Sequence, residues 1–456
     1  MKLKLSAIKI STLILALFTT LFFLAFSIFI GVVGSVFVVL ILGLLGYVIS
    51  HVIGSDRSSA PNIFLLAYCA SLIFSCLLYF SYSAKYGIPY YIGGSDDYKY
   101  EGDAILLAQS VSGYNAEMIA AAIDAPYHNS VGYVYFLSIL VNVAEIFGGF
   151  HTIMPRVFNG FVLGLSVVLL QSITFHAGFS RNSSFKVSLV VALLPINLFV
   201  AAHTFRDTIT AFFLLVLVWI ALHIQATKVS IKQALFILGF GCVMAVLYTF
   251  RSFYILAPIA IMAVVIAGHF LRSIKPIFGF SIIFAVFTLT AIGIMYSGHP
   301  LVSQLTGATQ GYDEYVKASA SGYSSLVFNA GYPVGVVLRV LYAGIYPVPT
   351  FGFTFEELAL SFGTVFQAYM YPFLFLGFVS LFSNKVLWPI FACFIVVYLG
   401  FVFGTFTFRH LVAVIPFGAI FILAGYTSYS KYRRLIFGGV TFAFFCAGVG
   451  IAITSL

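Results

Sequence analysis

The side chains best suited to chemistry lie in residues 95–103, which read SDDYKYEGD. Neighbouring like charges raise the pKa of a carboxylate, and such a group can act as a general base. The candidate catalytic residues are Asp96 and Asp97, with Glu101 and Asp103 as further carboxylates that contact a substrate. Carboxylate oxygens also bind divalent cations. A solvated acidic loop is the alternative interpretation.

A second polar group is the motif HTFRDT at residues 203–208, in a tight turn between two apolar runs. Arginine and aspartate are costly at membrane depth unless they are paired or functional. Further arginines end other apolar runs, and guanidinium groups match phosphate oxygens in geometry. We therefore predict a phosphate site made of Arg206, Arg251, Arg339, Arg409 and His410. The alternatives are a local Arg206–Asp207 ion pair and arginines that extend to lipid headgroups.

The elements that must position these groups are membrane helices. Hydrophobic residues make up 62% of the 456 residues and charged residues 8%, whereas roughly a quarter of the residues of a soluble domain are charged. About thirteen apolar runs (range about 11–14) approach the roughly 20 residues that a spanning helix needs. We predict an all-α polytopic membrane protein with a single transmembrane domain, residues 1–456. Basic residues form short loop clusters, so no nucleic-acid role is assigned.

The basic residues also predict the topology. Lys2, Lys4 and Lys9 place the N-terminus in the cytoplasm, and later basic clusters follow the positive-inside rule. This agreement requires that residues 131–147 and 336–346 form re-entrant or membrane-edge helices rather than spans. Twelve of the thirteen acidic residues then face outward.

Two long outer segments follow from this topology, residues 85–130 and 297–335. The first is acidic and carries the catalytic candidates. The second is rich in Gly, Ser and Tyr, and its tyrosines could stack on sugar rings. An ordinary surface loop explains the second segment equally well.

Several short motifs follow one another over about residues 85–426: Asp96-Asp97-Tyr98, His128 with Gly132, Phe147-Gly148, Arg156-Val157-Phe158-Asn159, Arg206-Asp207, and Arg409-His410 with Pro416. The order and sidedness of these motifs resemble the GT-C superfamily of membrane glycosyltransferases, which take sugars from polyprenyl-phosphate carriers on the outer side of the membrane. This chain departs from the family pattern in two ways: it has extra helices before the acidic loop, and it lacks a large soluble domain.

The resemblance implies an inverting transfer in which Asp96 or Asp97 deprotonates an acceptor hydroxyl while the arginines stabilise the lipid phosphate. Asp207 and His128 would contact the substrate. The implied partners are a polyprenyl-phosphate-linked sugar donor, a glycan or lipid acceptor, and membrane lipids. No cofactor is required, although a divalent cation on Asp97 and Asp207 stays open. The implied location is the bacterial inner (cytoplasmic) membrane, with the active face periplasmic.

Two other functions remain. A polymerase of O-antigen or exopolysaccharide repeat units would depend on the outer arginines more than on an aspartate. A lipid or polysaccharide transporter or flippase would need ionisable groups near the bilayer midplane and often an internal repeat, and the sequence shows neither.

Overall fold

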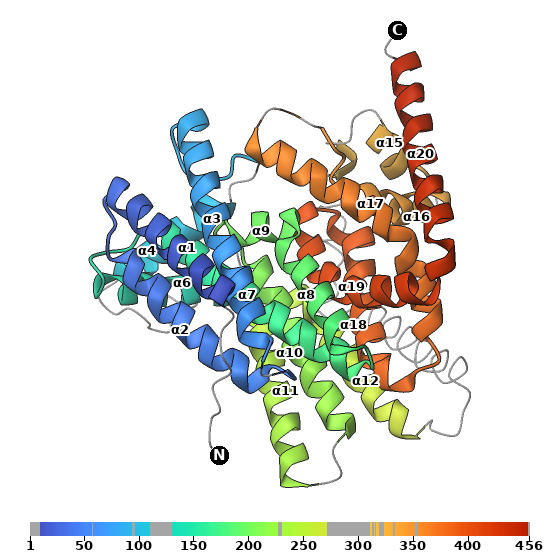
Figure 1. Ribbon diagram of the computed structural model, residues 1–456, viewed down its shortest axis with the longest axis horizontal. Coiled ribbons are helices and arrows are strands. Elements are labelled where there is room, and N and C mark those ends of the chain that lie inside the picture. The colour runs from blue at the N-terminus through green and yellow to red at the C-terminus, as the bar shows by residue number, and fades with distance from the viewer. Residues whose placement is uncertain are drawn as a thin grey trace.

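The computed structural model describes residues 10–454 apart from 57, 94–95, 110–129, 227–229, 271–310, 312–313, 315, 319–322, 332, 351 and 353. The described part is 85% helical and contains no β-strand. Figure 1 shows the helices in one assembly, with α1 to α4 and α6 at one side and α15 to α20 at the other. The prediction of an all-α polytopic protein is confirmed at this level.

The helices have the following bounds: α1 (Ile10–Phe29), α2 (Ser35–Ile53), α3 (Ala60–Tyr86), α4 (Asp96–Gln109), α6 (Val131–Glu145), α7 (Ile153–His176), α8 (Arg181–Leu193), α9 (Pro195–Ala201), α10 (Asp207–Ala226), α11 (Ile231–Phe250), α12 (Leu256–Phe270), α15 (Tyr323–Asn329), α16 (Val334–Tyr342), α17 (Phe355–Leu381), α18 (Trp388–Leu399), α19 (Leu411–Ser428) and α20 (Arg433–Thr454). A short 3₁₀ helix, η6 (Phe408–His410), precedes α19.

Nine helices of the described part are long and apolar enough to cross a membrane, or ten if the bent pair α8 and α9 counts as one span. Three further apolar helices are shorter, at residues 131–145, 252–268 and 334–345. The chain therefore has the helices of a multi-pass membrane protein. Their number in this part is lower than the predicted thirteen, and part of that prediction falls on residues 271–310, outside the described residues.

The bend between α8 and α9 has a local cause. Pro195 begins α9 and the two helices meet at 57°, because proline cannot donate the backbone hydrogen bond that would continue α8. Asn197 Nδ2 donates to the freed carbonyl of Val191 (2.7 Å). The bend directs α9 toward the turn at residues 202–206, which carries part of the polar motif.

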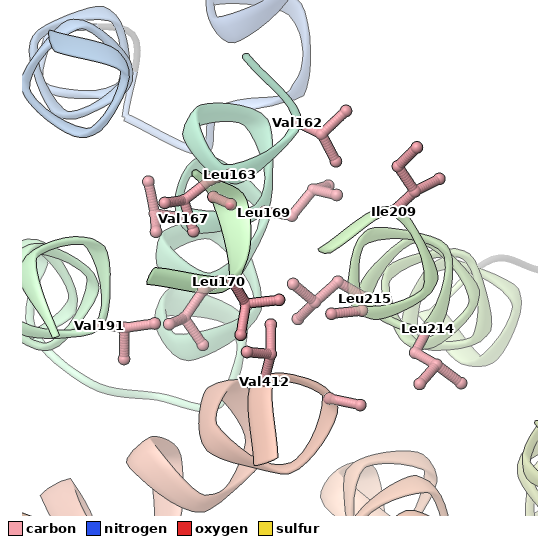
Figure 2. Close-up of a cluster of buried hydrophobic side chains, with 14 of the residues drawn as sticks. Val162, Leu163, Val167, Leu169, Leu170, Val191, Ile209, Leu214, Leu215 and Val412 are labelled. Atoms are coloured by element: carbon pink, nitrogen blue, oxygen red, sulfur yellow. The ribbon is translucent and has the colours of Figure 1, made fainter. Parts of the chain in front are cut away.

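Helix α7 forms the centre of the bundle, with 94% of its spanning window buried. Figure 2 shows its apolar side chains between those of α8, α10 and α19, including Leu170, Val191, Leu215 and Val412. By contrast, α1, α2 and α11 bury less than a third of their spanning windows. A helix that is apolar all round lies in a protein core or in lipid, so these three helices present their outer faces to the membrane.

The first and the last residues of helix α6 both lie at one end of the bundle. The turn between α1 and α2 lies so close to α6 that a Cβ at Gly34 would stand 1.5 Å from the carbonyl oxygen of Phe147. At the other end of α6, a Cβ at Gly132 would stand 2.3 Å from Thr249 Oγ1, near the end of α11. With 15 residues, α6 is about 22 Å long, shorter than the roughly 30 Å hydrocarbon core. That residues 131–147 lie at the membrane edge stays a prediction.

Candidate functional site

Three helix ends bring the predicted charged side chains together. Because α10 and α11 are consecutive spans, the start of α10 at Asp207 lies beside the end of α11, where Arg251 follows. Arg251 Nη1 lies 2.5 Å from Asp207 Oδ1, and Arg251 Nη2 also contacts His410 Nε2 just before α19. His410 Nε2 lies 3.7 Å from the same Asp207 oxygen. All three side chains are buried.

Two more arginines border this group. Arg206 Nη1 donates to the carbonyl of Phe250 (3.4 Å), and its guanidinium lies 5.8 Å from the ring centre of Tyr100. Arg409 lies over the ring of Phe205, 4.5 Å from its centre. We call Arg206, Arg251 and Arg409, with Asp207 and His410, the arginine cluster. The aromatic contacts hold the guanidinium planes in place and add cation–π attraction.

The two candidate bases at the start of α4 have different surroundings. Asp96 Oδ2 pairs with Arg409 Nη2 at 2.8 Å, and the Asp96 side chain is 34% exposed. Asp97 is fully buried and accepts backbone N–H groups from Thr204 (2.5 Å) and Tyr91 (3.2 Å). Consecutive helical residues point about 100° apart, so one carboxylate faces outward and the other faces the bundle. Only Asp96 is open to a substrate.

Asp97 also faces a buried arginine. Arg156 Nη2 lies 3.7 Å from Asp97 Oδ2 and donates to the carbonyl of Pro89 (2.5 Å). The Arg156 and Asp97 side chains are both 0% exposed. Asp97 thus joins the segment before α4, the turn that holds Arg206, and the first turn of α7. Its position indicates a structural role that holds the arginine cluster in place.

The arginine cluster concentrates positive charge. Among the residues that the structure describes, Asp207 pairs with Arg251, and Asp96 pairs with Arg409. All three arginines of the cluster act electrostatically on Asp207. Guanidinium groups gathered in this way match the geometry of phosphate oxygens, so the arrangement favours the binding of an anion with several oxygens, such as a phosphate group.

The remaining predicted residues lie elsewhere. Glu101 accepts a hydrogen bond from Tyr90 Oη (2.8 Å), and burial raises the pKa of its carboxyl. Asp103 is partly exposed, and partial burial raises its pKa against the effect of Lys99. Arg339 donates to the carbonyl of Phe328 (3.3 Å) rather than joining the arginine cluster. His128 and most of segment 297–335 lie outside the described residues.

The possible cation ligands already have protein partners. Asp97 accepts two backbone N–H groups, and Asp207 pairs with Arg251. Across the described ranges no group of three or more His, Cys, Asp or Glu side chains is arranged to hold a metal ion. Arginine neighbours also disfavour a bound cation by charge repulsion. The positive groups of the arginine cluster can supply the charge stabilisation that a cation would otherwise provide.

Sequence reasoning missed the role of Arg156. The sequence places Arg156 in a short motif at the start of an apolar run and indicates no role for it in the site. Its signal was an arginine inside a long apolar segment, where an unpaired charge is costly. The two backbone donors to Asp97, from Tyr91 and Thr204, carry no sequence signal because every residue except proline has an N–H group.

An apolar cavity of about 340 Å³ begins beside the arginine cluster. One wall is a face of α19 that starts at Leu411, the residue after His410, and continues to Tyr426. These positions cover about 22 Å along the helix. The other walls come from α8 and α17, for example Val190 and Phe366. The cavity can hold a hydrocarbon chain whose polar end lies at the arginine cluster.

Comparisons with known proteins identify no relative. No protein-family model, no curated protein and no solved structure matches the chain.

Proposed function

We propose that this protein is a membrane glycosyltransferase that moves a sugar from a polyprenyl-phosphate carrier to an acceptor glycan or lipid. One observation carries the proposal: three arginines converge beside the partly exposed carboxylate of Asp96, at the end of an apolar cavity. A lipid phosphate has the matching parts, an anionic head and a hydrocarbon chain. Asp96 supplies the base that a transfer to a hydroxyl needs.

In the proposed step, the acceptor oxygen forms a bond to the anomeric carbon of the donor sugar while the bond from that carbon to the phosphate oxygen breaks. The acceptor proton goes to Asp96, and the lipid phosphate leaves with the bonding electron pair. Arg206, Arg251 and Arg409 stabilise the charge that develops on this phosphate. The incoming phosphate competes with Asp96 for Arg409, which frees the carboxylate to accept the proton.

The proposal extends to cellular setting and family. Segment 85–130 and the arginine cluster would face the periplasm of a bacterial inner membrane, with the N-terminus in the cytoplasm. Support comes from the basic residues: Arg181, Lys232 and Lys385 lie at helix ends opposite the arginine cluster, as the positive-inside rule requires of cytoplasmic loops. A GT-C-like architecture with about thirteen helices remains part of this proposal, in which the arginines take the place of a divalent cation at the phosphate.

The proposal is tested with purified protein, candidate polyprenyl-phosphate sugars and acceptor lipids, with products identified by mass spectrometry. Asp96→Asn should reduce product formation at least ~100-fold, because general-base catalysis contributes about 10²–10⁴-fold. Asp103→Asn is the matched control, since this partly exposed carboxylate of the same helix lies away from the arginine cluster, and it should keep product formation. Full activity of Asp96→Asn would refute the assignment of the base.

A polymerase of polysaccharide repeat units is a second candidate. It is favoured by the burial of Asp97, which leaves one exposed carboxylate at the site beside three arginines. A polymerase would lose activity in Arg409→Ala while Asp96→Asn remained active, and its product would contain several repeat units. A single transferred sugar that depends on Asp96 supports the transferase.

A further inference from the structure

A second polar cavity lies at the opposite end of the bundle from the arginine cluster. It has a volume of about 190 Å³ and lies between the start of α3 and the start of α8, lined by Asp56, Ser59, Asn62, Arg181, Asn182 and Phe185. Helix α3 has 27 residues, so its two ends are about 40 Å apart. The two cavities share no lining residue, although both reach α8, where Phe185 lines the second cavity and Lys186 lines the apolar one.

The charges of this second cavity have opposite signs. Arg181 lies near enough to Asp56 to act on it electrostatically: partial burial raises the pKa of Asp56, but hydrogen bonds from Ser58 and Ser59 and the charge of Arg181 bring it below its ordinary value. Asp56 is therefore a carboxylate at neutral pH. Among the described residues that line it, the cavity thus offers the anionic Asp56 and the cationic Arg181 to a ligand.

The polar wall is built by a local hydrogen-bond network. Asp56 Oδ1 accepts from Ser58 Oγ (2.8 Å) and Asp56 Oδ2 accepts from Ser59 Oγ (2.9 Å). Gln171, which does not itself line the cavity, donates from Nε2 to Ser59 Oγ (2.7 Å). These hydrogen bonds hold the Asp56 carboxylate and the Ser59 hydroxyl in place at the cavity.

We propose that the second cavity binds the headgroup of a phospholipid that carries both a phosphate and a primary amine. The phosphate would lie at Arg181 and Asn182, at the start of α8, where backbone N–H groups also favour an anion. The ammonium group would lie at Asp56. The cavity is smaller than the roughly 300–1,000 Å³ typical of sites for drug-sized ligands, which suits a headgroup.

The surroundings favour a lipid over a soluble molecule. Helix α2 ends just before Asp56, and its last turns expose Leu44, Val48 and Val52, the last of them 71% exposed. Acyl chains can lie along this apolar face while the headgroup enters the cavity. Arg181 also lies above the partly exposed ring of Phe175, 5.9 Å from its centre, which keeps the guanidinium at the edge of the apolar surface.

The test is a titration of the purified full-length protein with phosphatidylethanolamine and, separately, phosphatidylglycerol, with bound lipid counted by native mass spectrometry. Phosphatidylethanolamine should bind more tightly to the unmodified protein. Arg181→Gln should weaken the affinity for both lipids about tenfold, as expected for the loss of one charged hydrogen bond. Arg434→Gln, an exposed arginine outside the cavity, is the matched control and should leave both affinities unchanged.

Asp56→Asn decides the zwitterionic part of the proposal. It should abolish the preference for phosphatidylethanolamine and leave phosphatidylglycerol binding intact. A preference that survives in Asp56→Asn would overturn the proposal, and so would equal losses in Arg181→Gln and Arg434→Gln. Because Asp56 also supports the α2–α3 turn, Asn182→Asp is a second variant, and its new negative charge should weaken both lipids.

Soluble phosphoethanolamine separates the two sources of this headgroup. If soluble phosphoethanolamine raises the unfolding temperature of the protein as much as the lipid does, the assignment of a lipid ligand is overturned. None of these measurements depends on glycosyl transfer.

Discussion

The arginine cluster predicts an asymmetry between its two most closely paired residues. Asp207 and Arg251 form a buried ion pair at 2.5 Å. Replacement of Asp207 by Asn removes a buried carboxylate on which all three arginines of the cluster act electrostatically. Replacement of Arg251 by Met instead leaves Arg206 and Arg409 to compensate Asp207. The two substitutions break the same ion pair but should lower the free energy of unfolding by different amounts.

The size of this difference follows from the charges that remain. Loss of one partner from a buried ion pair typically costs about 3–5 kcal/mol, because the other charge is left buried and uncompensated. Asp207→Asn should cost this full amount, because Arg206, Arg251 and Arg409 all act electrostatically on position 207. In Arg251→Met, the other two arginines still compensate Asp207, so the cost should be about half as large.

The assay compares the two variants by thermal unfolding in lipid nanodiscs, followed by the fluorescence of the two tryptophans. One scan rate is used throughout, because irreversible unfolding makes the apparent midpoint depend on this rate. Asp207→Asn should unfold at the lower temperature, and added pyrophosphate should stabilise it more than it stabilises the unmodified protein. If Arg251→Met unfolds first, Arg206 and Arg409 do not compensate Asp207 as we infer, and the anion site loses its electrostatic basis.

Three further predictions concern neighbouring polar contacts. Asp97→Ala should lower the free energy of unfolding by about 3–5 kcal/mol, because it leaves a buried arginine unpaired. Asp96→Ala should lower the free energy of unfolding by less than about 1 kcal/mol, because it removes a partly exposed ion pair. Equal unfolding temperatures of the two variants would contradict the environments that we assign to the two aspartates. Tyr82→Phe removes the hydrogen bond to Glu356 (2.8 Å) and should lower the free energy of unfolding by about 1–3 kcal/mol. The same unfolding scan measures this change, and an unchanged unfolding temperature would show that the contact is absent. Burial raises the pKa of Glu101 above 4.5, so the folded protein keeps this proton at pH values where the unfolded chain has released it. The free energy of unfolding should therefore fall as the pH rises above about 4.5. Glu101→Gln should lessen this fall, and a pH profile of stability that is unchanged in this variant would contradict the prediction.

The sequence predicted which charges share one end of the bundle. Apolar runs gave the alternation of spans, and the positive-inside rule gave their direction, so Arg206, Arg251 and Arg409 were expected on one side. Their convergence follows because consecutive spans place the end of one helix beside the start of the next. Arg339 did not join them because it belongs to the short helix α16, whose lateral position no charge rule determines.

The roles of Asp96 and Asp97 could not be separated in this way. Both are aspartates at the start of a helix with little apolar periodicity, so nothing in the sequence shows which one faces the bundle. The answer depends on partners far along the chain, namely Arg156 and the turn that contains Thr204.

The break at Pro195 has a consequence for the conditions under which an anion would bind. Because α9 turns toward the interior, the turn that follows it places Arg206 and Asp207 below the protein surface, where their side chains are nearly inaccessible to solvent. Mobile ions screen exposed charges over about 8–10 Å at physiological ionic strength but reach buried groups poorly. Affinity for a phosphate at this depth should therefore change little with added salt, unlike binding to a basic surface patch.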